Sequence, residues 1–217
     1  MFIGHYALAF GAKRMAPAVS LGTLFLACQF ADLLWPTLLM LGVEVVEIDP
    51  GNTLLTPLNF VSYPYSHSLV MLLVWSALFA ITYRLIRGSR PAAIATLAVL
   101  VFSHYVLDVI THRPDMPITI GGTERLGLGL WNHPTGTLAL ESALFIAGAT
   151  VYAASTRPRD RVGNIGLWSM IAALGAIYFA ALYGPPPPNT AAVAGAGQLL
   201  WLFVLWGYWV DRHRVVR

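Results

Sequence analysis

The segment SHYVLDVITH, residues 103–112, carries the side chains best suited to chemistry. It places His104, Asp108 and His112 at positions i, i+4 and i+8 of an apolar stretch. If this stretch is a helix, the three side chains share one face. An aspartate at the centre of a membrane helix costs about 2.5–3.5 kcal/mol on insertion scales, so a buried Asp108 needs a compensating partner. Imidazole and carboxylate groups on one buried face are typical of a divalent metal site.

Other ionisable residues lie in or beside apolar stretches within the first two-thirds of the chain. Charged residues inside membrane spans normally face the bundle interior, where they pair, bind ions or relay protons. Ligands converging from several helices suit Zn²⁺, with Mn²⁺ as the alternative. We predict one or two ions held by residues from the set His5, Asp32, His67, His104, Asp108, His112 and His133.

The number of ions depends on how the ligands of this one helix are shared. A straight helix separates His104 from His112 by about 12 Å, too far for direct ligation of one ion. Either one histidine lies outside direct contact, or two metals sit about 3.5–4 Å apart, a geometry that suits hydrolysis. A carboxylate not used as a ligand, Asp32 or Glu141, is the candidate general base. His5 fits the site only if the site lies near mid-membrane or the N-terminal segment tilts.

The composition of the chain indicates an integral membrane protein. Of its 217 residues, 57% are hydrophobic and 11% are charged, whereas soluble domains carry about 25% charged residues. The single cysteine, Cys28, excludes an intrachain disulfide and a thiolate zinc cluster. The net charge of +3 does not indicate nucleic-acid binding, because the basic residues are dispersed along the chain.

The apolar stretches predict an all-α polytopic transmembrane bundle. Residues 1–13 are too short to cross a bilayer and should form a half-helix. We treat residues 1–217 as one integral membrane domain, in which 1–150 hold the metal site and 151–217 supply two scaffold helices. The six expected spans lie at roughly 17–41, 66–86, 91–112, 135–156, 163–183 and 191–210.

The basic residues predict how this bundle is oriented. Arg113 and Arg125 would share one side with most of the loop carboxylates. The positive-inside rule makes the opposite side cytoplasmic, so the C-terminus would be cytoplasmic and the site would open outward. The other 11 of the 13 Lys and Arg residues lie on that cytoplasmic side in a six-span arrangement: Lys13, Arg14, Arg84, Arg87, Arg90, Arg157, Arg159, Arg161, Arg212, Arg214 and Arg217.

The order of several short motifs resembles a known family. GHYALAFGAKR at the N-terminus, the intramembrane Asp32, YSHS at 65–68 and SHYVLD at 103–108 resemble the YdjM-like family of inner-membrane metal-dependent hydrolases. The resemblance covers roughly residues 1–150. It implies a multi-pass protein of the bacterial cytoplasmic membrane, a metal site and a hydrolase activity.

A more distant likeness is to zinc-dependent phospholipase C and the P1-type nucleases. Those enzymes hold three zinc ions with His, Asp, His, HxxxD, His and HxxxE in chain order. The first four elements match His5, Asp32, His67 and His104-x-x-x-Asp108. The last motif is broken, because Thr137 stands four residues after His133 and Glu141 stands eight after it. A mononuclear or dinuclear site is therefore expected in place of a trinuclear one.

Two further functions remain open beside metal-dependent hydrolysis of a lipid or lipid-linked ester. The same residues could serve a proton- or ion-coupled transporter, although no inverted repeat is evident. They could also hold a structural metal in a membrane scaffold. Membrane lipid is the one expected partner, and the sequence gives no signature of a protein partner or of oligomeric state.

Overall fold

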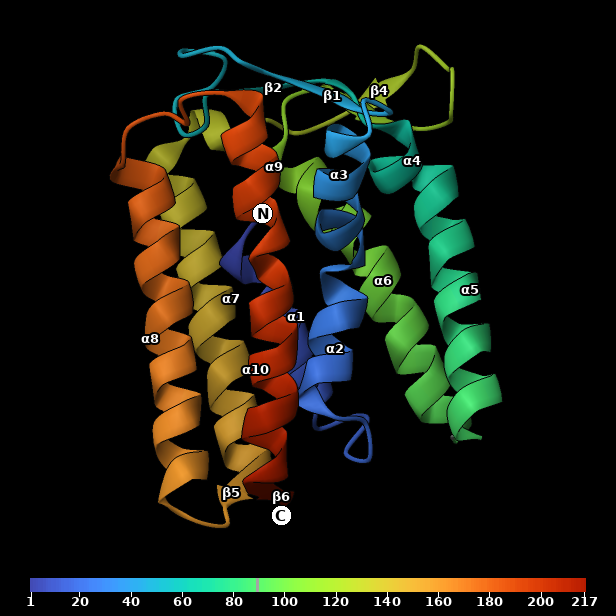
Figure 1. The fold of residues 1–217 in the computed structure, drawn as a ribbon, viewed down its shortest axis with the longest axis vertical. Helices are drawn as coiled ribbons and strands as arrows, with labels where there is room; N and C mark the ends of the chain where they lie inside the picture. Colours follow the sequence, from blue (N-terminus) through green and yellow to red (C-terminus); the bar gives the residue numbers. More distant parts are fainter. Residues whose placement is uncertain (89) are drawn as a thin grey trace.

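The computed structural model, which describes residues 1–88 and 90–217, is a bundle of helices that run along one axis (Figure 1). The prediction of an all-α bundle with about six spans is confirmed. The count is six if the helix pair α2 (Leu21–Cys28) and α3 (Phe30–Met40), bent by 58°, is taken as one broken span. The five other helical segments long and apolar enough to cross a bilayer are α5 (Leu69–Arg87), α6 (Pro91–Thr111), α7 (Pro134–Ser155), α8 (Arg161–Tyr183) and the run of α9 (Thr190–Gln198) and α10 (Leu200–Arg212).

The predicted half-helix is present as α1 (Ile3–Ala12). Ten residues span about 15 Å, half the thickness of a bilayer core, so α1 begins inside the bundle, ends at the turn beyond Ala12 and does not cross a bilayer. Its backbone lies directly against α7, because a Cβ atom added to Gly148 would fall 2.2 Å from the carbonyl oxygen of Ala7. Close backbone approach at a small residue is the usual way that membrane helices pack. This contact fixes the position of α1 and hence of His5.

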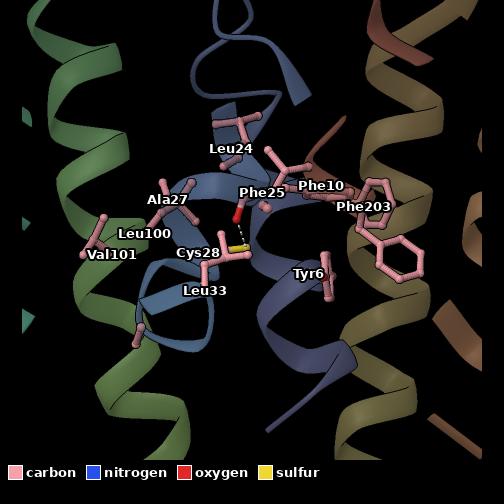
Figure 2. Close-up of a cluster of buried hydrophobic side chains, with 14 of the residues drawn as sticks. Tyr6, Phe10, Leu24, Phe25, Ala27, Cys28, Leu33, Leu100, Val101 and Phe203 are labelled. Carbon is pink, nitrogen blue, oxygen red and sulfur yellow. Dashed lines mark hydrogen bonds between the residues drawn. The ribbon is translucent and has the colours of Figure 1, made fainter. Parts of the chain in front are cut away.

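Aromatic side chains fill the space between α1, α2 and α10. Figure 2 shows Tyr6 and Phe10 of α1 beside Phe25 of α2 and Phe203 of α10. The rings of Tyr6 and Phe25 meet edge to face at 4.9 Å, and those of Phe10 and Phe25 at 5.1 Å. Edge-to-face pairs are worth about 0.5–1.5 kcal/mol each beyond their buried area. The aromatic cluster therefore anchors α1 below the buried polar residues described next.

The two ends of the bundle differ in structure, as Figure 1 shows, and also in charge. One end, called the basic end, carries the turn after α1, the α5–α6 connection, and β5 (Thr156–Pro158) paired with β6 (Arg214–Val216). The opposite end, called the loop end, carries four further strands and two short helical segments. These are β1 (Val45–Ile48) with β2 (Leu58–Ser62), β3 (Met116–Pro117) with β4 (Arg125–Leu126), α4 (Pro64–His67) and η1 (Leu130–Asn132).

The basic end gathers the eleven Lys and Arg residues that the sequence places on one side. Among them, Lys13 is buried and its Nζ lies 2.9 Å from Oδ2 of Asp211, which ties the end of α1 to α10. The segregation of charge supports the predicted arrangement of the spans. Which end faces the cytoplasm stays a prediction from the positive-inside rule.

The break between α2 and α3 shapes the interior. α2 ends at Cys28 and α3 begins at Phe30, with Gln29 between them. A bend leaves the last carbonyl groups of the first helix without intrahelical donors. It also turns Asp32, in the first turn of α3, towards the bundle axis near the inner end of α1.

Candidate metal centre

Five of the predicted ligands converge in the interior of the bundle. His5 comes from α1, Asp32 from α3, His67 from α4, and His104 and Asp108 from α6. The histidines and Asp108 are 0–4% exposed, while the side chain of Asp32 is 23% exposed. Donor atoms of His5, His104 and Asp108 lie within 4.8 Å of one another, as do those of Asp32, His67 and His104. The expectation that these five side chains meet at one place is met.

Four donor atoms of this cluster, two histidine nitrogens and two carboxylate oxygens, lie close to one another. Nε2 of His104 is 3.1 Å from Oδ2 of Asp108 and 3.6 Å from Oδ1 of Asp32. Nε2 of His67 is 3.4 Å from the same Asp32 atom and 3.9 Å from the same Asp108 atom. Ligands held about 2.0–2.1 Å from a tetrahedral zinc ion are separated from one another by about 3.3 Å. The four nitrogen–oxygen separations within this set of atoms, called the tetrad, are therefore close to those between ligands of one metal ion.

The ring of His104 is oriented by the backbone at the α2–α3 break. Its Nδ1 lies 2.8 Å from the carbonyl oxygen of Cys28, so Nδ1–H donates to a carbonyl that the end of α2 leaves free. The lone pair of a neutral ring then lies on Nε2. That atom is buried and makes no hydrogen bond with the described residues, although two carboxylate oxygens are near it. A lone pair facing carboxylates fits a cation placed between them, so the residues fit a metal ion.

His5 occupies the other side of Asp108. Its Nε2 lies 3.1 Å from Oδ1 of Asp108, and its ring stacks on that of His104. The amino group of Met1 lies 2.5 Å from the same Oδ1 atom. The two oxygens of Asp108 thus have different partners. Oδ2 belongs to the tetrad, and Oδ1 contacts the amino group of Met1 and the ring of His5. His5 either orients this carboxylate or ligates a second ion that shares it.

Glu141 lies beside the cluster and outside the two groups of candidate ligands. Its Oε2 accepts hydrogen bonds from the backbone N–H groups of Phe2, at 2.9 Å, and Gly4, at 3.2 Å. Phe2 is the N-cap residue of α1 and Gly4 lies in its first turn, where a helix has unsatisfied donors and favours a negative charge. Glu141 is 1% exposed and therefore caps the buried start of α1.

A cavity of about 210 Å³ adjoins the cluster and extends towards the loop end. Asp32, His67, Asp108 and Glu141 form its polar wall, and His112 contributes to the rim. The remaining wall is largely apolar and includes side chains of α8, so α8 helps to form the site as well as the scaffold. The main apolar lining residues are Trp35, Leu55, Leu58, Phe60, Trp131, Tyr178 and Leu182.

His112 and His133 are not brought into the cluster. His112 follows the last residue of α6, and its Nδ1 lies 2.9 Å from Oδ1 of Asp115. Burial among the rings of Phe60 and Trp131 lowers the pKa of His112 below its ordinary value, against the opposing effect of Asp115. His133 is exposed at the start of α7. The separation expected from helix geometry thus keeps His112 away from the tetrad.

Three residues that support these side chains, Asp115, Glu44 and Ser66, are not among the candidates that the sequence indicates. Asp115, in the turn RPDMP, pairs with His112. Glu44 and Ser66 form a hydrogen-bonded chain to His67. The acidic pattern VEVVEID around Glu44 is typical of a solvated loop, so only the folded chain shows that this carboxylate is buried.

Comparison of the chain with protein-family models, with curated proteins and with solved structures found no match. The resemblance to the YdjM-like family therefore stays a prediction carried by short motifs. The structure shows a bundle of membrane-span helices around a buried His/Asp cluster that is able to hold a metal ion.

Proposed function

We propose that the protein is a membrane-embedded, metal-dependent hydrolase that acts on a lipid or lipid-linked phosphoester or ester. The observation that carries this proposal is the tetrad of Asp32, His67, His104 and Asp108 beside a cavity that Asp32, His67 and Asp108 line. Asp108 is buried and Asp32 is partly buried among apolar helices, where cations offset the desolvation of carboxylates. The amino group of Met1 already pairs with Oδ1 of Asp108, and a divalent ion would neutralise the remaining negative charge of the two aspartates.

The chemistry follows from the residues around the tetrad. A bound Zn²⁺ or Mn²⁺ would lower the pKa of a water molecule and polarise a phosphoryl or acyl oxygen. Hydrolysis forms a bond from the water oxygen to phosphorus or carbon and breaks the bond to the leaving oxygen. Glu141 lines the same cavity and has one oxygen, Oε1, outside its capping hydrogen bonds, so it is the candidate to carry the water proton to the leaving oxygen.

The shape of the cavity supports a lipid substrate. Its wall combines the polar cluster with aromatic and aliphatic side chains of α3, α8 and the loop end. Such a wall suits a molecule with a polar ester group and an apolar chain. With the basic end in the cytoplasm, the cavity opens to the extracytoplasmic side of the membrane. We propose the bacterial cytoplasmic membrane as the location, from the same family resemblance.

Metal content and turnover test the proposal together. Protein purified in detergent is supplemented with Zn²⁺ or Mn²⁺, freed of excess metal and measured by mass spectrometry for metal per chain. The same samples are assayed with bis(p-nitrophenyl) phosphate and p-nitrophenyl butyrate. We expect one or two ions per chain and chelator-sensitive turnover of one of the two esters, both abolished in His104→Ala. Wild-type protein without bound metal would overturn the proposal.

The same samples separate the two alternative functions. A scaffold with a structural metal binds the ion, unfolds on chelation and turns over neither ester. An ion-coupled transporter in liposomes gives solute flux that Asp108→Asn abolishes and chelators do not affect. Either result replaces hydrolysis as the function of the cluster.

A further inference from the structure

The ring of His67 is the end of a buried chain of hydrogen bonds that begins at Glu44. Nδ1 of His67 lies 2.6 Å from Oγ of Ser66, and that hydroxyl lies 2.6 Å from Oε2 of Glu44. Ser66 is 0% exposed and Glu44 is 2% exposed. The chain links the segment after α3 to the short helix α4, which carries His67.

The directions of these hydrogen bonds follow from the groups involved. Oε1 of Glu44 accepts the backbone N–H groups of Tyr65, at 2.8 Å, and Ser66, at 2.9 Å, which favours an ionised carboxylate. An ionised carboxylate only accepts, so the Ser66 hydroxyl donates its one proton to Oε2 of Glu44. The same hydroxyl oxygen then has only lone pairs to offer His67. Nδ1 of His67 is therefore the donor.

These donor and acceptor roles determine which nitrogen of His67 carries no proton. With the proton on Nδ1, the lone pair of the neutral ring lies on Nε2. Nε2 is the atom placed 3.4 Å from Asp32 and 3.9 Å from Asp108 in the tetrad. The backbone carbonyl of Cys28 has the same effect on His104. Partners of this kind fix the tautomer and the angle of a ligand ring.

We propose that Glu44 and Ser66 are positioning residues that hold His67 in the Nδ1-protonated form and direct its Nε2 lone pair into the tetrad. The part of this inference that concerns metal affinity rests on the proposed function. The tautomer itself does not, because the hydrogen bonds are present without an ion. Loss of such partners typically lowers metal affinity 10- to 100-fold.

Glu44→Gln gives the sharpest test. The side chain keeps its size, but the hydrogen bond between residue 44 and Ser66 reverses its direction. The carboxamide accepts the two N–H groups with its oxygen and donates from its nitrogen to Ser66. The Ser66 hydroxyl then donates to Nδ1 of His67, which moves the ring proton to Nε2 and removes the ligand lone pair. The nitrogen chemical shifts of ¹⁵N-labelled histidine report this change at pH 8 in metal-free protein.

Zn²⁺ affinity, measured by competition with a chromophoric chelator, gives the second readout. We expect Ser66→Ala and Glu44→Gln to bind Zn²⁺ about 10- to 100-fold more weakly, and Ser66→Thr, which keeps the hydroxyl, to stay within about threefold of wild type. Ser68→Ala is the matched control. Ser68 is also buried next to His67, but its hydroxyl caps α5 by accepting the N–H of Met71 at 3.2 Å.

The outcomes separate the two proposals. If wild-type His67 carries its proton on Nε2, or on both nitrogens, at pH 8, the positioning role is overturned whatever the protein binds. Wild-type Zn²⁺ affinity in both Ser66→Ala and Glu44→Gln overturns it as well. If wild-type protein binds no metal, the proposed function fails, while the nitrogen shifts of the wild type and Glu44→Gln still decide the tautomer.

Discussion

The imidazole rings of His5 and His104 lie face to face, with centroids 3.8 Å apart and planes 1° from parallel. Two positively charged rings in this arrangement would repel each other strongly in an apolar interior. The pair therefore accommodates at most one positive charge, and the neutral ring is the form that binds a metal. Both rings face Asp108, so the stack places two nitrogen donors against one carboxylate.

His104→Ala and Asp108→Asn should each remove the metal. Either change takes one corner from the tetrad, and Asp108→Asn also leaves the cluster with an extra positive charge when an ion is bound. We expect metal content to fall from at least one ion per chain to less than about one-tenth, since each variant loses one of the four donor atoms of the tetrad. Mass spectrometry of metal-supplemented protein measures this. His133→Ala, an exposed histidine, should bind as wild type does, and equal metal content in all four proteins would contradict the tetrad.

Glu141→Gln should separate catalysis from stability. The amide oxygen can still accept the N–H groups of Phe2 and Gly4, so the cap on α1 is largely kept. We expect metal content to be unchanged and the free energy of unfolding to fall by about 1 kcal/mol or less. Turnover of the nitrophenyl esters should fall about 100-fold, as is typical for loss of a general base. Full turnover in this variant would restrict Glu141 to its role as a cap.

Gly148→Ala should weaken metal binding although residue 148 is far from the ligands in sequence. The new methyl group would meet the backbone of α1 at Ala7, so α1 must shift and carry His5 with it. Overpacking of this kind typically costs about 1–3 kcal/mol. Thermal unfolding and Zn²⁺ affinity both report the change. Gly175→Ala is the control, because its methyl group would point into open space on α8, and the argument fails if the two variants behave alike.

His112 should make the protein less stable in mild acid. Burial holds its pKa below 6.5, so the folded state binds fewer protons at this ring than the unfolded state does. Its contribution to stability is complete above about pH 6.5 and is lost as the pH falls towards the folded pKa, with a limiting slope of about 1.4 kcal/mol per pH unit. Chemical unfolding at a series of pH values from 7.5 to 5, with His112→Gln as reference, isolates this slope. Parallel curves for the two proteins would show that the ring does not titrate in this way.

The positions of the ligands could be predicted because charged residues in apolar helices are rare. Asp32, His104 and Asp108 stand out in the sequence for this reason, and the structure brings them together. Whether His5 could contact the other ligands depended on the depth at which α1 begins. The contact between Gly148 and Ala7 settles that depth, and a lone glycine in a helix does not reveal which helix it faces.

The residues that orient the ligands could not be predicted in the same way. The break between α2 and α3 occurs at Gln29, with neither glycine nor proline at that position to signal it. The carbonyl of Cys28 is a backbone group, which every residue has, so the identity of residue 28 does not predict its hydrogen bond with His104. Glu44 lies in an acidic loop sequence, and its burial depends on how the chain crosses over α4. Such features arise from tertiary contacts, which composition and periodicity do not contain.

The bend at Gln29 also has a consequence for how the protein is made. α2 has 8 residues and α3 has 11, so neither alone reaches the roughly 20 residues that a membrane crossing needs. Asp32 leaves the ribosome well before its partners on α6, and an unpartnered aspartate opposes insertion by about 2.5–3.5 kcal/mol. We expect the two short helices to rest at the membrane surface until α6 arrives with His104 and Asp108. Insertion of α2 and α3 would then be coupled to the contact of Asp32 with His104. The same residues that form the candidate metal centre would thus determine when these two helices enter the membrane.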